Sequence, residues 1–173
     1  MDVWQHGNLS ADQEKKRLAL VAEFRSQPEL RETRLHVGIS PTRHLIFGAL
    51  LGPGRLEVFP FAWSEPGRSY NMLCYLGSDV CGHLGVVHGG LLATMLDEVF
   101  LRCCSEALPH AVFMTANLTI NYKSPVYVGR DVAIRVKIIS VEGRKVRVEG
   151  CIETLDDRQP RATAEALFIS VVN

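Results

Sequence analysis

The chain is organised around the stretch Gly85-Val86-Val87-His88-Gly89-Gly90-Leu91-Leu92-Ala93-Thr94-Met95-Leu96-Asp97-Glu98. No glycine or proline interrupts residues 91–108, and Pro109 ends the run. A helix that is apolar on nearly every side must lie inside a fold, so the pattern predicts a buried helix over 91–108. That helix carries Asp97, and a carboxylate in a core is costly unless it is paired or solvated. We therefore expect a cleft that brings Asp97 together with the amide groups opening its own helix.

Alternating apolar and polar residues follow the helix in four segments, 112–122, 131–138, 145–153 and 161–168. A period of two is typical of strands in an antiparallel sheet with one buried face. In the first segment, the alternation places Met114, Ala116 and Leu118 on one face. Thr115 falls on the other face, which is predicted to turn away from the helix.

The last segment carries small residues on its apolar face, Ala162, Ala164 and Ala166, which leave room for a helix to pack closely. The predicted class is α+β, with one long apolar helix wrapped by a curved antiparallel sheet. Such a sheet has open edges, and pairing between two copies of the chain is a natural way to cover them.

An N-terminal helical extension, residues 1–55, is expected before the main domain at 56–173. Ser10 and Gln13 form a capping-box pattern that predicts a helix to about Gln27. Its expected apolar side contains Leu18, Val21, Ala22 and Phe24, and Lys15-Lys16-Arg17 is interpreted as a solvated face. Two further strands are predicted, over 56–59 and 70–76, separated by a loop at 63–69.

The composition excludes several classes of protein. Lys plus Arg and Asp plus Glu number 19 each, so the net charge is zero and no overall field favours nucleic acid. No apolar run is long enough to span a bilayer. The start Met1–His6 lacks the features of a signal peptide, which predicts a cytoplasmic protein, or a mitochondrial one if a targeting segment precedes this sequence. The five cysteines show no CxxC spacing and are interpreted as reduced core residues rather than metal ligands.

These motifs resemble the hotdog-fold thioesterase superfamily. The resemblance rests on His88-Gly89-Gly90, the nine-residue step to Asp97, and the strand from Met114 that leads to Asn121-Tyr122-Lys123-Ser124-Pro125. It covers roughly residues 56 to 172, and it is strongest toward thioesterase superfamily members 4 and 5 and the phenylacetic-acid-type acyl-CoA thioesterases.

The resemblance implies hydrolysis of acyl-CoA thioesters by a homodimer or a dimer of dimers, with active sites between subunits and no cofactor or metal. It further implies that Asp97 is the catalytic carboxylate, that Thr115 assists across the interface, and that the His88-Gly89-Gly90 turn binds the thioester carbonyl. Many relatives place an amide side chain shortly before this turn. Here the region is Cys81-Gly82-His83-Leu84, so that role is either absent or taken by His83.

The chemistry of these residues agrees with such a role. The N-terminus of a helix offers unpaired N–H groups, and Gly89 and Gly90 let a carbonyl approach the backbone closely. Asp97 is suited to act as a general base on water or as a nucleophile. Structural alternatives stay open at this point: a paired helix carboxylate for Asp97, turn packing for His88, and an ordinary strand position for Thr115.

Two further expectations concern charged residues. Coenzyme A carries phosphates, so basic residues in or beside predicted turns are candidate phosphate ligands: Lys123, Arg130, Arg144 and Lys145. Glu98 stands four residues before Arg102, which predicts an ion pair on the helix. Two other functions remain as alternatives: a hotdog dehydratase or hydratase, and a non-catalytic acyl-CoA-binding dimer.

Overall fold

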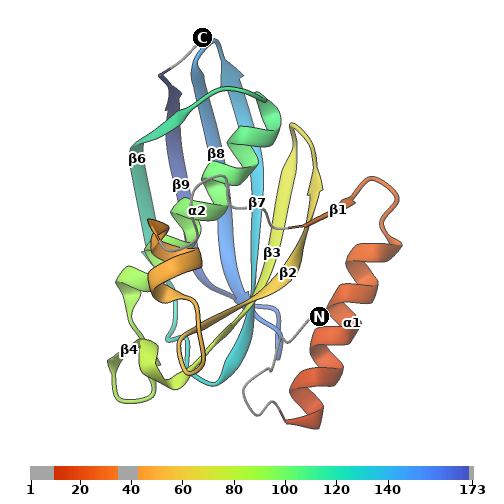
Figure 1. Ribbon diagram of the computed structural model, residues 1–173, viewed down its shortest axis with the longest axis vertical. Helices are drawn as coiled ribbons and strands as arrows, with labels where there is room; N and C mark the ends of the chain where they lie inside the picture. The colour runs from red at the N-terminus through yellow and green to blue at the C-terminus, as the bar shows by residue number, and fades with distance from the viewer. Residues whose placement is uncertain (1–9, 35–42, 172–173) are drawn as a thin grey trace.

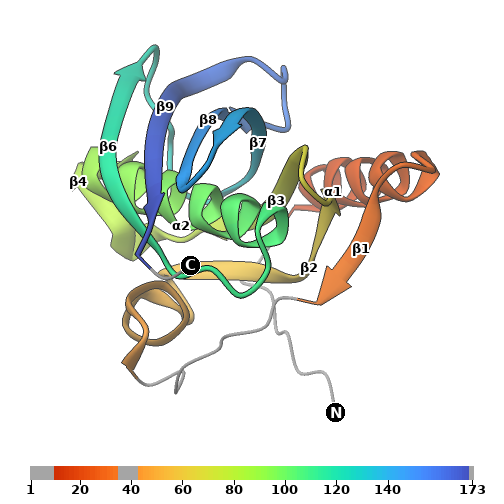
Figure 2. The same ribbon diagram turned by 90° about the horizontal axis from the view of Figure 1, so that it is seen from above.

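The computed structural model describes residues 10–34 and 43–171. Its central element is the helix α2 (Gly89–Ala107), which a seven-stranded sheet wraps on one side (Figures 1 and 2). The helix α1 (Ala11–Ser26) lies on the outside of this sheet. The predicted α+β architecture is therefore confirmed. The start Met1–His6, which lacks the sequence features of a signal peptide, lies outside the described residues.

The large sheet is antiparallel throughout and has the strand order β1-β2-β3-β7-β8-β9-β6. Its strands are β1 (Arg31–Arg34), β2 (Leu56–Glu65), β3 (Ser69–Leu76), β6 (Phe113–Tyr122), β7 (Arg130–Glu142), β8 (Lys145–Thr154) and β9 (Pro160–Ser170). The short 3₁₀ helix η3 (Ser78–Val80) precedes a small hairpin of β4 (Cys81–His83) and β5 (Val86–Val87). The loop expected at 63–69 is wrong at its start, because β2 continues to Glu65.

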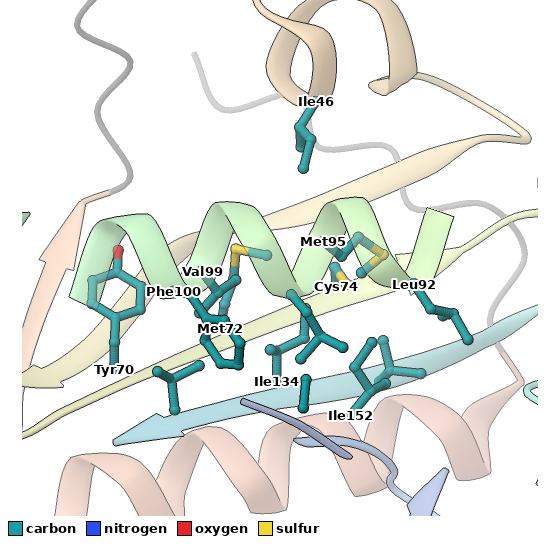
Figure 3. Close-up of a cluster of buried hydrophobic side chains, with 14 of the residues drawn as sticks. Ile46, Tyr70, Met72, Cys74, Leu92, Met95, Val99, Phe100, Ile134 and Ile152 are labelled. Carbon is teal, nitrogen blue, oxygen red and sulfur yellow. The ribbon is translucent and has the colours of Figure 1, made fainter. Parts of the chain in front are cut away.

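The main core lies between α2 and the inner face of the sheet (Figure 3). The small residues of β9 are fully or nearly buried, as their alternation predicted. Gly150 on β8 adds to this close approach, because a Cβ there would lie 2.7 Å from Phe100 Cε1 and 2.5 Å from the Arg135 carbonyl oxygen. Any larger residue at this position would push Phe100 and α2 away from the sheet.

A second apolar cluster lies between α1 and the outer face of β2, β3 and β7. Phe24 stacks on Trp63 with ring centroids 4.9 Å apart. The capping box at Ser10 is confirmed, since both of its hydrogen bonds are present. The solvated face expected for Lys15-Lys16-Arg17 is wrong at Arg17, which is buried and pairs with Asp131 of β7 at 2.5 Å.

The apolar side of α1 is also rotated from the expected one. Leu20 is buried, whereas Leu18 and Ala22 are exposed. The reason is that the guanidinium of Arg17 takes a buried position that the pattern of apolar residues does not reveal. α1 is therefore fixed to the sheet by both apolar packing and a buried ion pair.

A π-helix, η2 (Leu45–Leu50), packs against α2. Ile46 and Phe47 belong to the main core, and the Arg102 guanidinium of α2 lies 4.6 Å from the centroid of the Phe47 ring. Thus residues 45–50, like strand β1, pack directly onto the unit expected at 56–173.

Candidate active site

Thr115 and Asp97 form a hydrogen-bonded pair within one chain. The Thr115 hydroxyl donates to Asp97 Oδ1 over 2.7 Å. Asp97 is half-buried on α2, and Thr115 is exposed on β6. The pair therefore holds a carboxylate in a fixed orientation at a position that solvent reaches.

A β-bulge explains why Thr115 faces its own helix. Thr115 pairs with Phe168 of β9, but the next pair joins Asn117 to Leu167, so Ala116 has no partner. The extra residue shifts the alternation, and Thr115 shares the helix-facing side of β6 with Leu118. The expectation that Thr115 turns away from its own helix is therefore wrong.

The turn before α2 is closed by His88, which caps the helix. His88 has an extended backbone, with φ −62° and ψ 126°, and its Nδ1 accepts the N–H of Gly90 at 2.9 Å. Because Nδ1 is an acceptor, the neutral imidazole carries its proton on Nε2. Gly82 packs against this residue, since a Cβ there would lie 3.0 Å from His88 Cα. His88 thus orients the turn through a helix cap.

The cap leaves one amide of the turn available. The His88 N–H donates to the Val80 carbonyl, the Gly90 N–H to the His88 imidazole, and the Leu91 N–H to the His88 carbonyl. Among the described residues, the N–H of Gly89 therefore stays without an acceptor at the positive end of the helix dipole. Of the backbone amides in the His88-Gly89-Gly90 turn, the Gly89 N–H is therefore the remaining candidate for the oxyanion donor.

Helix geometry separates this amide from Asp97 of the same chain. The two residues are eight positions apart, which at 1.5 Å per residue places them about 12 Å apart along the axis. A reacting carbonyl must lie about 3 Å from both its oxyanion donor and its attacking group. A single thioester carbonyl therefore cannot contact both Asp97 and the Gly89 amide of the same chain.

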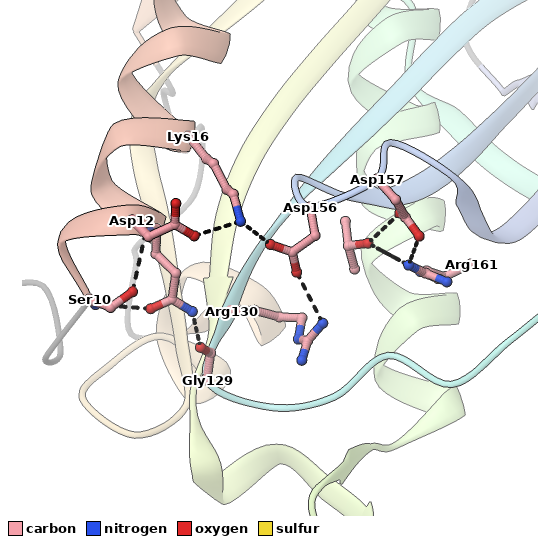
Figure 4. Close-up of polar contacts among 10 residues, drawn as sticks. Ser10, Asp12, Lys16, Gly129, Arg130, Asp156, Asp157 and Arg161 are labelled. Carbon is pink, nitrogen blue, oxygen red and sulfur yellow. Dashed lines mark hydrogen bonds and ion pairs between the residues drawn. The ribbon is translucent and has the colours of Figure 1, made fainter.

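The structure places the candidate phosphate ligands in different regions. Lys123 directly follows β6, is exposed, and forms no ion pair with any residue of the described ranges. Arg130 pairs with Asp156 at 3.4 Å (Figure 4). Arg144 and Lys145 lie at the β7–β8 hairpin, at the opposite end of the sheet from the turn before α2 (Figure 1).

Two other candidates were selected from the sequence: His83, which lies near the turn, and Glu98, which follows Asp97. His83 is exposed on β4, next to the Gly82 that packs on His88. The predicted ion pair between Glu98 and Arg102 is confirmed at 2.8 Å, and it is largely shielded from solvent. Glu98 is therefore committed to a structural contact on the side of α2 that η2 covers.

Buried thiols do not supply a nucleophile. Burial raises the pKa of Cys103 and Cys104 to about 12, and it raises the pKa of Cys74 as well. These groups stay protonated at neutral pH, and the thiolate is the reactive form. Within residues 10–34 and 43–171, no group of three or more His, Cys, Asp or Glu side chains could hold a metal ion.

Tyr122 is a site residue that sequence reasoning missed. Its hydroxyl donates to the Gly89 carbonyl at 2.9 Å. The signal was present in the sequence, because Tyr122 falls on the same face as Leu118 and Ile120. The contact itself could not be predicted from that face, because Gly89 lies 33 positions away in the sequence.

Residues 84–161, which contain the turn, Asp97 and Thr115, match the sequence model of the Thioesterase superfamily. The Escherichia coli PaaI protein from the phenylacetic acid degradation operon has the same fold, with a TM-score of 0.61 and 12% identity over 92% of this chain and 95% of that chain. The resemblance to the hotdog-fold thioesterase superfamily is confirmed. The BH2602 protein of Bacillus halodurans, solved with CoA, is 27% identical with a TM-score of 0.53, covering 57% of this chain and 65% of that chain.

Curated relatives of this hotdog chain cover different parts of it. A UPF0644 protein of Schizosaccharomyces pombe is 29% identical over 93% of this chain. Acyl-coenzyme A thioesterase THEM4 of Mus musculus is 37% identical over 55% of it, and an uncharacterized mitochondrial protein of Candida albicans is 31% identical over 62%. The chain spans 65%, 40% and 49% of the length of these relatives, respectively. In the part that the structure describes, no helix is both long and apolar enough to cross a membrane.

Proposed function

We propose that this chain hydrolyses acyl-CoA thioesters to a free acid and CoA. The observation that carries the proposal is the Thr115–Asp97 hydrogen bond, which presents an oriented carboxylate on the central helix of a hotdog fold. The match to the Thioesterase superfamily, the mouse acyl-CoA thioesterase relative and the CoA-bound structural neighbour all support this substrate class.

Asp97 supplies the attacking group by one of two routes. As a general base, its carboxylate takes a proton from water while the water oxygen bonds to the thioester carbon and the C–S bond breaks. As a nucleophile, the carboxylate oxygen attacks that carbon directly and forms an anhydride, which water then cleaves. In both routes the CoA sulfur leaves and is protonated, and Thr115 holds the carboxylate by donating to its other oxygen.

The oxyanion donor in this proposal comes from a second copy of the chain. The carbonyl oxygen gains negative charge during attack, and the Gly89 N–H is suited to receive it. Since about 12 Å separate this amide from its own Asp97, one thioester is served by Asp97 and Thr115 of one protomer and by Gly89 of its partner.

The edge strand β6 offers the surface for this pairing. β6 bonds only to β9 within the described residues, so its other edge is open. Met114 and Tyr122 on this strand are more than half exposed, at 56% and 54%. Pairing of two β6 edges would join the sheets of a homodimer and bring the two α2 helices together.

Lys123 is the basic residue that best fits a CoA phosphate in this arrangement. It directly follows Tyr122, which contacts Gly89, so its backbone lies close to the turn that is proposed to receive the thioester. Arg130 already neutralises Asp156. Arg144 and Lys145 lie far from the turn before α2. They could contact CoA only if the substrate extends along the dimer interface.

The test is release of free CoA thiol from a panel of acyl-CoA substrates, from acetyl to palmitoyl. We expect turnover with at least one chain length, and we expect Asp97→Asn to abolish it while the fold persists, because an Asn oxygen still accepts from Thr115. Loss of enoyl-CoA absorbance without thiol release would indicate a hydratase instead. Binding of acyl-CoA with no turnover would indicate a non-catalytic binding protein.

The cellular location is also a proposal. The mitochondrial relative of Candida albicans favours a mitochondrial location over the cytoplasmic alternative. Fractionation of cells that express the full-length protein with a C-terminal tag tests this, and recovery only in the cytosolic fraction would contradict it.

A further inference from the structure

We infer that Tyr122 is a positioning residue for the oxyanion donor, which rests on the hydrolase function proposed above. Its hydroxyl donates to the Gly89 carbonyl oxygen at 2.9 Å. Its ring lies against the same residue, since a Cβ on Gly89 would be 3.5 Å from the nearest ring carbons. Tyr122 is 54% exposed, so its position is not explained by burial in the core.

The bond from Tyr122 completes the restraint of the peptide unit between Gly89 and Gly90. The N–H of this unit donates to His88 Nδ1 at 2.9 Å, and its carbonyl oxygen accepts from Tyr122. The preceding unit is held at its carbonyl, because the His88 oxygen accepts the Leu91 N–H at 2.9 Å. The two restrained planes meet at Gly89, and together they fix the direction of its N–H.

This restraint matters because two consecutive glycines are conformationally permissive. An oxyanion donor is effective when it is already aimed at the developing charge, and a small misdirection weakens it. Without the hydroxyl of Tyr122, the Gly89 carbonyl loses its side-chain donor and keeps only the backbone hydrogen bond of the helix, so the plane is held less firmly. We therefore expect the loss to act on the transition state more than on substrate binding.

The test compares Tyr122→Phe with Tyr127→Phe. Tyr122→Phe keeps the ring and removes only the hydroxyl. Tyr127 is a matched control, because it is also half exposed, at 50%, and lies five positions along the chain with its ring beside Arg130. We expect kcat of Tyr122→Phe to fall about tenfold, equivalent to about 1.4 kcal/mol, with KM within about twofold of the wild-type value.

Further readouts separate positioning from a merely structural role. Affinity for a non-hydrolysable acyl-CoA thioether and the Tm of Tyr122→Phe should both stay close to wild type, while Tyr127→Phe keeps the wild-type kcat. Wild-type kcat in Tyr122→Phe would overturn the inference while leaving the hydrolase intact. A fall in kcat that is matched by a rise in KM or a loss of Tm would overturn it too. Absence of thiol release from the wild-type chain would instead overturn the proposed function, and this inference with it.

Discussion

Replacing Thr115 by valine removes the hydroxyl that orients Asp97 and changes little else. Valine keeps the β-branched shape that suits a strand. The lost contact is the 2.7 Å hydrogen bond from Thr115 Oγ1 to Asp97 Oδ1. The carboxylate stays on α2, but its oxygens become free to rotate and to take solvent in place of the hydroxyl.

The size of the effect follows from the nature and exposure of this bond. A hydrogen bond to a charged group contributes about 1.5–3 kcal/mol when water is excluded. Thr115 is exposed, so water replaces part of that interaction, and we expect a loss of about 1–1.5 kcal/mol at the transition state. This corresponds to a fall of about 5- to 12-fold in kcat.

The assay is thiol release under saturating acyl-CoA, with Thr119→Val as the control. Thr119 lies on the same strand but bonds to Asn117 Oδ1 at 3.3 Å instead of to a residue of α2. We expect Thr119→Val to keep the wild-type kcat and both variants to remain dimeric. Equal rates for Thr115→Val and the wild type would refute the view that the hydroxyl orients the carboxylate.

Two further substitutions and one chemical modification test other contacts in the structure. Arg17→Met leaves Asp131 buried without its guanidinium, which should cost about 3–5 kcal/mol and lower Tm by about 6–20 °C; a shift below about 2 °C in a thermal melt would contradict the buried ion pair. Gly90→Ala places a Cβ 2.9 Å from the capping imidazole of His88. We expect loss of a helix cap worth about 1 kcal/mol and a Tm lower by about 2–4 °C. An unchanged thermal melt would argue against the cap. Iodoacetamide at pH 8 should modify exposed Cys81. The raised pKa of Cys103 keeps that thiol protonated and unreactive until the pH approaches about 12 or the chain unfolds. Equal modification of the two thiols in peptide mass mapping would contradict the burial of Cys103.

Much of the fold could be predicted from the sequence because its signals are local. The absence of Gly and Pro between 91 and 108 marked the helix to within two residues of its start, and the period of two marked the strands that follow it. The capping box at Ser10 was equally direct. In each case the chemistry of neighbouring residues decides the structure.

The errors arose where a distant residue decides the structure. Arg17 looked solvated because its partner, Asp131, lies 114 positions away in the sequence. Thr115 was placed on the wrong face because a bulge depends on pairing with β9, which the spacing of residues in β6 does not encode. The contact of Tyr122 with Gly89 likewise joins residues 33 positions apart, so local spacing did not reveal it.

The residues of the candidate site could be selected from the sequence, whereas their arrangement depends on the three-dimensional structure. Asp97, Thr115 and the glycine turn were all selected from the sequence, which gave two expectations for their assembly: a crevice shared by the acid and the start of its own helix, and, from the family resemblance, sites between subunits. Eight residues of helix separate the two groups by about 12 Å, which is why the proposed function assigns the two halves of the site to different protomers.

A matched pair of variants can separate those two halves. Asp97→Asn disables the acid, and Gly89→Pro removes the proposed oxyanion donor. Proline suits this place because it is the first residue of α2, where proline is favoured, and because His88 already has the extended backbone that must precede proline. Each variant alone should form an inactive dimer with a native circular dichroism spectrum.

The most direct measurement is thiol release by a heterodimer of these two variants, isolated through a different affinity tag on each chain. If each site combines Asp97 of one protomer with Gly89 of its partner, one of the two sites in the heterodimer is intact, and we predict about half of the wild-type activity per dimer. If acid and amide act within one chain, both sites carry a defect. A folded, doubly tagged heterodimer with no more activity than its inactive parents would therefore contradict the shared site.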